Sequence, residues 1–461
     1  MKIRRALGVT VAVAALALAA GCSSGGSSGG GGSSGGSTVI HWWTWDPNQA
    51  QAYEACATAF HKANPDITVQ ISQYDVNDYF TKLTAGFVAG NAPDAFQNSP
   101  QYFEQYANQH QLMPLNSFIS ASKLNLNQYS VGVGMWQYKD GKQYALPMDW
   151  ASAGIYYNKK MLTQAGFTQQ QADNMTWDPT DGGTFTKMVA HMTIDDKGVR
   201  GDQPGFDKSH VKTYGIGVIN DDDFIGQTEW SPFISTLGWT LGNTVMWPTQ
   251  FNYNDPRFVE TMNWVKSLQD KGYAPPFDEF TQGNGQGTIA DYTLLGTGKV
   301  AMTVGGSWEA ATFSKLPGVQ VGIAPTVLGP SNTRAIVGSS NGNNMWAGTK
   351  NPQQTWKWMS YQESQACQTM AGKSGTFFPS IAASMNAVAQ TLAAQGVDLS
   401  TWTQALADKE VHPAEVYTNG NQMQLTMQPL LDEFFSGKQG DAVFAQMQQQ
   451  SQKILTGTPG A

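Results

Sequence analysis

The sequence contains few charged residues for its length. Asp, Glu, Lys and Arg make up 13% of the 461 residues, about half of the roughly 25% that is usual in soluble domains. The 27 Lys and Arg residues are outnumbered by 35 Asp and Glu residues, so the formal net charge is -8. Nucleic-acid binding requires clustered basic residues against phosphates. This composition therefore argues against a nucleic-acid partner.

Long apolar runs are also absent. No run approaches the ~20 residues that a membrane-spanning helix requires, so a multi-span membrane protein is excluded. Aromatic residues are abundant, with 15 Trp, 16 Tyr and 21 Phe, and this argues against extensive disorder. The length allows about two to three domains.

The motifs of common enzyme classes are missing. The six His residues form no His-x-x-x-His pair and have no Cys-x-x-Cys companion, so no metal site of the zinc type is expected. Gly372-Lys373-Ser374 resembles the end of a Walker A loop, but Cys367 stands where its first glycine is required. Asp221, Asp222 and Asp223 could hold calcium, although a solvated acidic loop is the simpler interpretation. We expect no cofactor.

The N-terminus has the features of an export signal. Residues 1–5 are basic, and the apolar or small residues 6–20 are too short to span a bilayer but suit a signal peptide. The small residues before Cys22 resemble a bacterial lipobox. Residues 1–22 are therefore predicted to be a lipoprotein signal peptide with lipidation at Cys22, with an ordinary secretory signal as the alternative. Residues 23–37 contain only Ser and Gly, as in a flexible linker.

Cys56 and Cys367 are the two other cysteines of the chain. They could form a disulfide or remain two buried thiols. An oxidising compartment and the even count favour the disulfide.

Strand and helix signals alternate near the start of the mature chain. Strand patterns at 39–43, 67–71 and 94–96 alternate with helical spacing at 53–60 and 79–87. Asp46-Pro47 supplies an N-cap and an N1 proline, and Asn64-Pro65 ends the first helix. The order β-α-β-α-β implies a parallel sheet with right-handed crossovers. Ligands bind at the carboxyl ends of such strands, where this sequence has Trp43, Trp45, Asp75 and Asn98.

Many segments together resemble one family, the extracellular solute-binding proteins of family 1. These are the carbohydrate-binding lipoproteins of ABC importers, and they include maltose-binding proteins. The resemblance extends from Val39 to Leu455. The segments that carry it, in the order of the family, are 63–69, 78–83, 89–95, 144–147, 155–159, 214–216, 230–233, 255–257, 298–308, 350–353 and 356–359.

The resemblance implies an α/β fold of the two-lobe periplasmic-binding-protein type II, with a hinge and a ligand cleft between discontinuous lobes. Members of the family close around the ligand by a hinge motion. Crossings near Asp149, 334–335 and 376–378 would divide the chain into lobe 1, at 38–149 and 336–375, and lobe 2, at 150–335 and 376–461. Cys56 and Cys367 would then lie on helices of the same lobe, which is compatible with a disulfide.

Sugars require aromatic platforms for their C–H faces and polar partners for their hydroxyl groups. Trp308 matches an aromatic position of the family that often stacks on sugar. Ala151 occupies the family's acidic sugar-binding position, so the chain departs there from the maltose-type pattern. The candidate ligand contacts are Trp43, Trp45, Asp75, Asn98, Asp149, Trp230, Gly306, Trp308, Ser340, Asn341 and Tyr417.

These features predict a monomeric, lipid-anchored substrate-binding subunit of an ABC importer, without catalytic activity. Its partners would be a carbohydrate, with an oligosaccharide favoured, and the permease subunits. The expected location is the outer face of a Gram-positive cytoplasmic membrane, or the periplasm. The alternative is a secreted glycoside hydrolase, which would use two carboxylates about 5–10 Å apart beside the same aromatic platforms. A polyol or a glycerol phosphodiester also remains open as the ligand.

Overall fold

The computed structural model describes residues 37–217, 224–280 and 290–457, all of which belong to the unit Ser37–Ala461. The predicted signal peptide with Cys22, nearly all of the Ser/Gly linker and the acidic run Asp221–Asp223 lie outside the described residues. No helix within the described ranges is long and apolar enough to cross a membrane.

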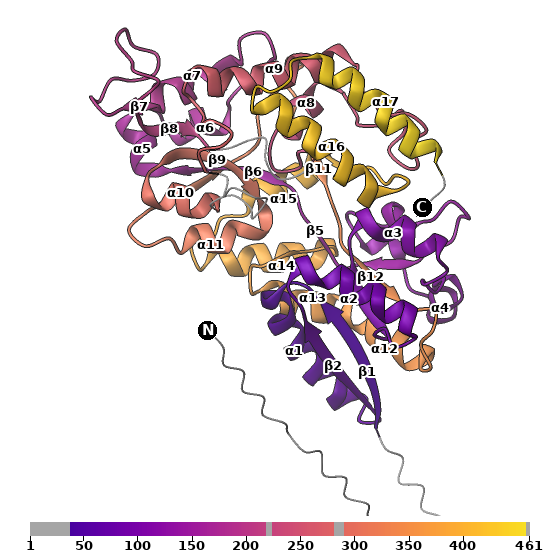
Figure 1. Cartoon of the computed structure of the whole chain (residues 1–461). Helices are drawn as coiled ribbons and strands as arrows, with labels where there is room; N and C mark the ends of the chain where they lie inside the picture. The colour runs from indigo at the N-terminus through magenta and orange to yellow at the C-terminus, as the bar shows by residue number, and fades with distance from the viewer. Residues whose placement is uncertain (1–36, 218–223, 281–289, 458–461) are drawn as a thin grey trace, which may run out of the picture. The chain divides into compact units, whose positions relative to one another are not determined.

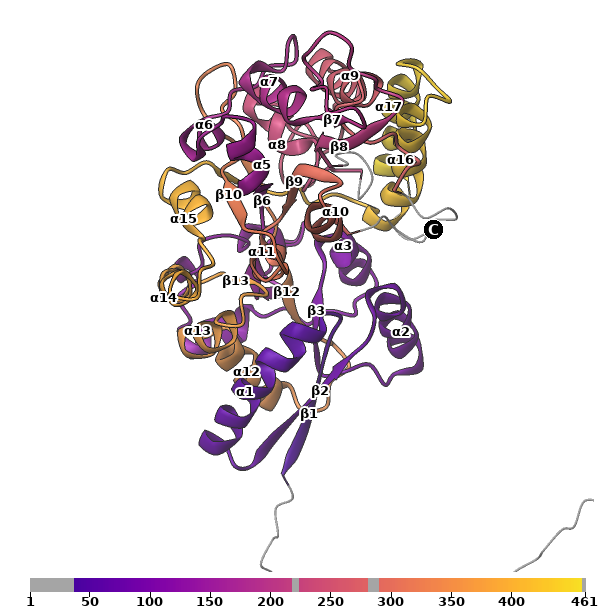
Figure 2. The ribbon, with the colours of Figure 1, turned by 90° about the vertical axis from the view of Figure 1, so that its left-hand side faces the viewer.

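The first sheet is built mainly from the beginning of the chain (Figures 1 and 2). Its strand order is β2-β1-β3-β12-β4. The bounds are β1 Thr38–Thr44, β2 Ile67–Gln73, β3 Ala95–Asn98, β4 Ala145–Pro147 and β12 Gly342–Met345. β1 pairs in parallel with both β2 and β3, which confirms the predicted parallel arrangement. β12 pairs antiparallel with β3 and β4.

Helices cover both faces of this sheet, as Figure 2 shows for α1 and α2. The Asp46 carboxylate accepts hydrogen bonds from the backbone of Asn48 and Gln49, Pro47 is the first helical residue, and Asn64 is the C-cap. α1 therefore begins and ends where the capping signals predict. The helices beside this sheet are α1 Pro47–Ala63, α2 Val76–Ala89, α3 Pro100–Asn108, α4 Asn116–Ser122, α12 Pro352–Gln362 and α13 Gln365–Gly372.

The second sheet has the order β10-β6-β9-β8-β7. Its strands are β6 Ala153–Asn158, β7 Ile194–Asp195, β8 Val211–Ile216, β9 Val300–Gly306 and β10 Val321–Ala324. β6 and β9, its central pair, are buried along their whole lengths. The remaining helices are α5 Lys159–Gln164, α6 Gln169–Asp173, α7 Gly183–Met192, α8 Ser231–Ile234, α9 Pro256–Asp270, α10 Asp291–Thr297, α11 Ala310–Ser314, α14 Ala382–Ala393, α15 Ser400–Ala407, α16 Gly420–Phe435 and α17 Ala442–Thr456.

Short strand pairs connect the two sheets. β5 (Asp149–Trp150) follows the first sheet's β4 and precedes the second sheet's β6, and it pairs with β13 (Phe378–Pro379). β11 (Ile336–Gly338) precedes β12 and pairs in parallel with β14 (Val411–Pro413). A bridge between Ala151 and Ser339 brings the two connections into contact. The chain therefore passes between the sheets at adjacent places.

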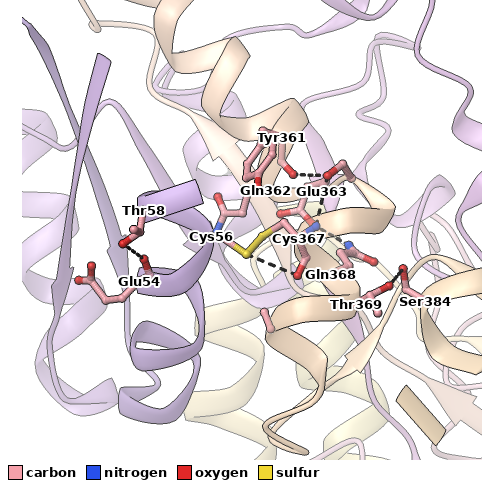
Figure 3. The surroundings of a disulfide bond; sticks show 12 residues. Glu54, Cys56, Thr58, Tyr361, Gln362, Glu363, Cys367, Gln368, Thr369 and Ser384 are labelled. Carbon is pink, nitrogen blue, oxygen red and sulfur yellow. Dashed lines mark hydrogen bonds between the residues drawn. A yellow bond between two sulfur atoms is a disulfide. The ribbon is translucent and has the colours of Figure 1, made fainter. Parts of the chain in front are cut away.

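A disulfide joins α1 to α13 through Cys56 and Cys367, whose Cα atoms are 5.4 Å apart. This is one of the two arrangements that the sequence left open. Figure 3 shows that buried polar side chains lie beside it. Gln368, next to Cys367, donates hydrogen bonds to the backbone of Met148 (3.0 Å) and to Ser380 Oγ (2.8 Å). The disulfide region is thereby joined to the connecting segments before β5 and after β13.

Candidate functional site

A cavity of about 390 Å³ lies where segments from both sheets meet the connecting strands. Its volume is within the roughly 300–1,000 Å³ of small-molecule sites. The first sheet contributes the residues after β1 and β3, and the second sheet contributes the turn after β9. The lining residues are Trp45, Asp46, Gln49, Val76, Ser99, Pro100, Asp149, Trp150, Ala151, Gln227, Ser307, Trp308, Ser339, Ser340, Asn341, Thr376 and Phe377.

Two indole rings line this cavity from different sheets. Trp45 follows the carboxyl end of β1 and packs against Tyr79 and Phe80 of α2, with ring centroids 5.3 and 5.4 Å away. Trp308 lies in the turn after β9 and is 41% exposed, which is uncommon for so large an apolar side chain. A Cβ at Gly306 would overlap the Trp308 ring. Glycine at position 306 therefore lets the ring lie against the backbone.

Asp149 organises the polar side of the cavity. It is 2% exposed and accepts hydrogen bonds from Asn341 N (2.8 Å), Asn341 Nδ2 (3.0 Å) and Gln49 Nε2 (3.2 Å). Burial raises the pKa of this carboxyl group, and the hydrogen bonds from Asn341 and Gln49 oppose that rise. Because the Asn341 amide nitrogen faces Asp149, its carbonyl oxygen is left to accept a hydrogen bond from a ligand.

A chain of buried amides extends from Asp149 into the first sheet. Gln97 Nε2 donates to Gln49 Oε1 at 3.0 Å, and Thr44 Oγ1 donates to Gln97 Oε1. Tyr79 donates its hydroxyl hydrogen to the Gln97 carbonyl at 2.7 Å. This series of hydrogen bonds fixes the rotamer of Gln49, which lines the cavity. Because Gln49 also donates to Asp149, the same series helps to fix the rotamer of Asn341.

Several predicted site residues come together here. Trp45, Asp149, Trp308, Ser340 and Asn341 all line the cavity, and Gly306 supports Trp308. Ser340 is 1% exposed and donates to the Asp149 carbonyl at 2.6 Å, so it holds the connection between the sheets.

Other predicted residues lie elsewhere. Trp230 is fully buried in the core of the second sheet, where it packs on Trp239 and Phe258 at 5.9 and 5.4 Å. Tyr417 packs on Phe224 and Phe251 at 5.8 and 5.4 Å and is 7% exposed. Neither ring lines the cavity, because each is enclosed by other aromatic side chains.

The remaining predicted residues belong to the first sheet. Trp43 packs on Tyr74 at 4.8 Å and does not line the cavity. Asp75 is exposed and also lies outside the lining. Asn98 is fully buried in β3, where its backbone pairs with Gly342. Side chains alternate along a strand, so only some residues near each strand end can face the cavity.

Several of the lining residues were not predicted from the sequence. Gln49 lies in the first turn of α1 beside the capping Asp46, and Pro100 begins α3 directly after β3. Their positions just beyond strand ends are the signal that could have identified them. Phe377 lies in the crossing that the family resemblance implies near 376–378. Gln227 has no comparable signal, because tertiary contacts alone bring it to the cavity.

The cavity offers neutral hydrogen-bonding groups and aromatic rings. No Lys or Arg occurs among its lining residues. Its two carboxylates are engaged, since Asp46 caps α1 and Asp149 accepts three hydrogen bonds. Across the described ranges, no cluster of three or more His, Cys, Asp or Glu side chains is placed to hold a metal ion. The arrangement suits a neutral, hydroxyl-rich ligand.

The sequence matches the family model for bacterial extracellular solute-binding proteins over residues 55–395, which is well over half of the chain. The chain is a member of this family. The match includes most of both sheets, the disulfide and the cavity-lining residues from Val76 to Phe377.

Two relatives of this solute-binding protein are named for the sugars that they bind. The maltodextrin-binding protein MdxE of Bacillus subtilis is 25% identical over 329 residues, with 68% of this chain and 66% of MdxE aligned. A lactose-binding protein of Rhizobium radiobacter is 28% identical over 142 residues, with 30% of this chain and 32% of the relative aligned. The chain thus spans just under two thirds of the first relative and about one third of the second.

Solved structures share the fold. UspC of M. tuberculosis superposes with a TM-score of 0.72 at 24% identity, covering 90% of this chain and 100% of UspC. Lmo0181 of Listeria monocytogenes, solved with cycloalternan, gives 0.73 at 19% identity, covering 90% and 98%. The GacH receptor of Streptomyces glaucescens, solved unliganded and with acarbose, gives 0.71 at 18% identity, covering 91% and 98%. These likenesses confirm the predicted two-lobe α/β fold.

Proposed function

We propose that this solute-binding protein is the extracellular substrate-binding subunit of an ABC importer, which captures a carbohydrate between two lobes and delivers it to the permease subunits. The observation that carries the proposal is the pair Trp45 and Trp308. These indole rings come from different sheets and line one cavity together with neutral amides and hydroxyls. Sugar binding needs this combination of flat apolar surface and positioned hydrogen-bonding groups.

Aromatic surface beyond the cavity supports an oligosaccharide as the ligand. Phe80, which touches Trp45, stacks on Tyr102 with ring centroids 3.9 Å apart and an interplanar angle of 10°. Both rings are half-buried. Val76 lines the cavity one helical turn before Phe80, so the rings continue from its rim. A second sugar unit could pack on this surface while the first occupies the cavity.

The charge of the cavity argues against the other solutes considered. Phosphate groups are usually bound by Arg forks or by Lys, and no cavity-lining residue is of either type. A glycerol phosphodiester is therefore disfavoured relative to a neutral sugar. A polyol has the hydroxyl groups but lacks the flat C–H face that an indole ring recognises.

The proposal includes hinge closure of two discontinuous lobes, with lobe 1 at 38–149 and 336–375 and lobe 2 at 150–335 and 376–461. The adjacent connections at β5, β11 and β13 support a hinge in this region. We further propose a monomer that is anchored by a lipid on Cys22, at the outer face of a Gram-positive cytoplasmic membrane or in the periplasm. Apart from the permease subunits, we propose contact with the membrane through this lipid anchor only, and no nucleic-acid partner.

The proposed protein binds its sugar without cleaving it. A glycoside hydrolase needs one carboxyl group free to protonate the leaving group and a second free to act as base or nucleophile. Asp46 and Asp149 are the carboxylates that line the cavity, and both are engaged in holding the fold. This engagement of both carboxylates disfavours the hydrolase alternative.

A thermal-shift screen against mono- and oligosaccharides, followed by chromatography of the sugars, tests the proposal. Ligand at 100 times its Kd adds about 2.7 kcal/mol to the free energy of unfolding, so we expect a raised Tm with one sugar class and unchanged sugar afterwards. Cleavage of the sugar would support the hydrolase instead. If no sugar in the screen raises the Tm, carbohydrate binding is contradicted.

A further inference from the structure

A second cavity, of about 180 Å³, adjoins the first. We call it the hinge chamber because Val337 of the connecting strand β11 lines it, together with Ile225, Ser231, Trp239, Val245 and Glu415. Gln227 lines both cavities, so they adjoin at this side chain. The sugar-binding proposal assigns no role to the hinge chamber.

The size and walls of the hinge chamber suit a small ring. Most of its lining surface belongs to apolar groups, including the indole of Trp239 and the side chains of Leu241 and Val245. Trp239 and Leu241 are 5% and 2% exposed. An apolar protein cavity of about 150 Å³ accommodates benzene, so a six-membered ring is of the right size.

Polar side chains also line the hinge chamber, and they belong to Gln227, Ser231, Ser235, Thr240, His412 and Glu415. Ser231 is 4% exposed, and its hydroxyl has no hydrogen-bond partner among the described residues. Glu415 accepts a hydrogen bond at Oε1 from Leu241 N (2.9 Å), and no side chain in the described part of the chain donates to its carboxylate. Burial raises the pKa of Glu415. A buried hydroxyl without a hydrogen-bond partner lowers the stability of the fold. A ligand that carries a hydrogen-bond donor could donate to the Ser231 hydroxyl oxygen or to the Glu415 carboxylate.

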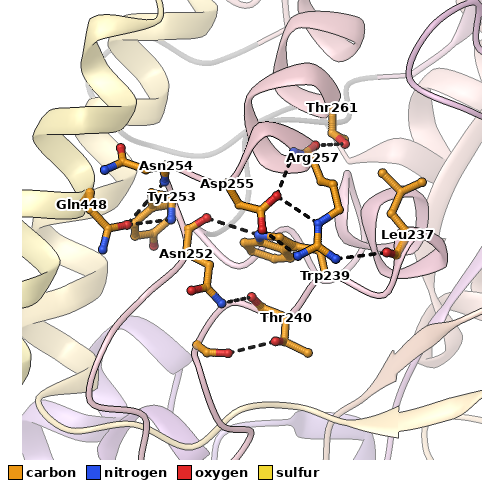
Figure 4. A network of polar contacts seen from close by, with 11 residues as sticks. Leu237, Trp239, Thr240, Asn252, Tyr253, Asn254, Asp255, Arg257, Thr261 and Gln448 are labelled. Atoms are coloured by element: carbon orange, nitrogen blue, oxygen red, sulfur yellow. Dashed lines mark hydrogen bonds and ion pairs between the residues drawn. The ribbon is translucent and has the colours of Figure 1, made fainter.

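The wall of the hinge chamber is held in place from behind. Trp239 Nε1 donates to the Asn252 carbonyl at 3.2 Å, and Asn252 Nδ2 donates to the Thr240 carbonyl at 2.9 Å. Figure 4 shows these contacts beside the Asp255–Arg257 ion pair, in which Arg257 also donates to the Leu237 carbonyl at 3.2 Å. Because these bonds fix Trp239 without a ligand, binding would cost little ordering of the wall.

We propose that the hinge chamber binds a ring-sized apolar group that carries one hydrogen-bond donor, as a phenol does. The group is either a substituent of the glycoside in the main cavity, reached past Gln227, or a free small molecule. The chemistry of the chamber is the same in both cases. This inference stands on the chamber's own residues and does not require the main cavity to bind sugar.

The first arm of the test uses 4-fluorophenol alone, followed by ¹⁹F NMR. We expect saturable line broadening with the wild-type protein. Val245→Phe fills the chamber and should abolish the effect, while Val88→Phe, the same change at a side chain that is 87% exposed on α2, should retain it. Ser231→Ala and Glu415→Gln should each weaken binding several-fold. Circular dichroism verifies that each variant is folded.

The second arm compares methyl maltoside with 4-hydroxyphenyl maltoside by calorimetry. A gain of tenfold or more for the aryl glycoside, lost in Val245→Phe, assigns the chamber to a substituent of the sugar. Binding of 4-fluorophenol without such a gain assigns it to a free molecule. The inference is overturned if 4-fluorophenol does not bind saturably and the aryl glycoside binds no more tightly than methyl maltoside. It is also overturned if Val245→Phe leaves both 4-fluorophenol binding and the affinity gain of the aryl glycoside unchanged. Failure of both maltosides with retained 4-fluorophenol binding would count against a maltose-type ligand in the main cavity and leave the chamber assigned.

Discussion

Single residues in the cavity divide into those that present a surface to a ligand and those that hold other residues in position. Trp45 and Trp308 present rings, and Asn341 presents a carbonyl oxygen. Asp149 and Gln49 are positioning residues, since their polar atoms are hydrogen-bonded within the protein. Substitutions in the two groups should therefore have different effects on affinity and on stability.

Trp308→Ala should weaken sugar binding about 10- to 100-fold, which is roughly 1.4 to 2.8 kcal/mol, because it removes an exposed stacking ring. The ring is 41% exposed, so the Tm should change little. Calorimetric titration and thermal unfolding measure the two effects. Trp43→Ala is the matched control, since Trp43 lies outside the cavity lining and its loss should leave affinity unchanged. Equal affinities of Trp308→Ala and wild type would show that the cleft is misplaced.

Glu363 should make stability depend on pH. The side chain is fully buried and accepts hydrogen bonds from Gln368 (2.7 Å) and Asn343 (3.1 Å). Burial raises its pKa well above the ordinary value, the hydrogen bonds oppose the rise, and the charge of Asp149 adds to it. The folded protein then holds this proton more tightly than the unfolded chain. Its contribution to stability is full below about pH 4 and is lost as the pH rises through the folded-state pKa.

The matching test compares urea unfolding of wild type and Glu363→Gln between pH 4 and pH 8. Glutamine resembles the protonated acid, so the free energy of unfolding of the variant should decline less than that of wild type as the pH rises. Glu54→Gln, at an exposed position of α1, should leave the wild-type pH profile unaltered. Parallel profiles for wild type and Glu363→Gln would contradict the assignment.

Residue type, position and the family resemblance together predicted the cavity only in part. Trp308 and Trp230 both stand beside polar residues in the sequence, yet one is 41% exposed and the other is fully buried. The difference arises from packing on Trp239 and Phe258, and no local pattern reports these distant contacts. Asp149 was predicted as a ligand contact, and it does line the cavity, but its hydrogen bonds assign it a positioning role.

At the scale of elements, the turn between β9 and α11 presents Trp308. Gly306→Ala should disturb this turn, because the added Cβ would overlap the indole ring and the ring must move. We expect sugar affinity to fall about 3- to 10-fold, with a small change in Tm. Gly134→Ala is the control, since a Cβ there meets no atom within 4 Å. The same affinity for Gly306→Ala and wild type would show that the ring's placement does not matter.

The disulfide between α1 and α13 should stabilise the fold without forming the cavity. It closes a loop over a sequence separation of 311 residues, and loops of such length place it near the upper part of the roughly 2–5 kcal/mol range of disulfides. Reduction, or the double change Cys56→Ser with Cys367→Ser, should lower the urea midpoint accordingly. Reductant should have no effect on the double variant. An unchanged midpoint after verified reduction would refute this role.

The first elements were predictable because their signals are local. The Asp46-Pro47 cap, the Asn64 stop and the alternating strands correspond to β1, α1 and β2 as observed. No local pattern predicts that β12 and β4 join the same sheet. Pairing between strands about 200 residues apart in the sequence leaves no periodic signal. The family resemblance placed both segments in lobe 1 but did not predict their pairing.

At the scale of the whole molecule, the proposed sugar capture takes place where the two sheets meet. The connecting strands β5, β11 and β13 lie beside the cavity, so a ligand that touches both walls would stabilise a closed arrangement. The cavity has lining residues from both sheets. A structure with bound sugar would show whether the sugar contacts both sets of residues.

The most direct test is a crystal structure of the protein with a saccharide that raises its Tm. We predict one sugar ring stacked on the Trp308 indole, a hydroxyl hydrogen-bonded to Asn341 Oδ1, and contact with Trp45 from the other sheet. A saccharide bound on another surface, or one in the cavity that touches neither indole, would contradict the proposed site.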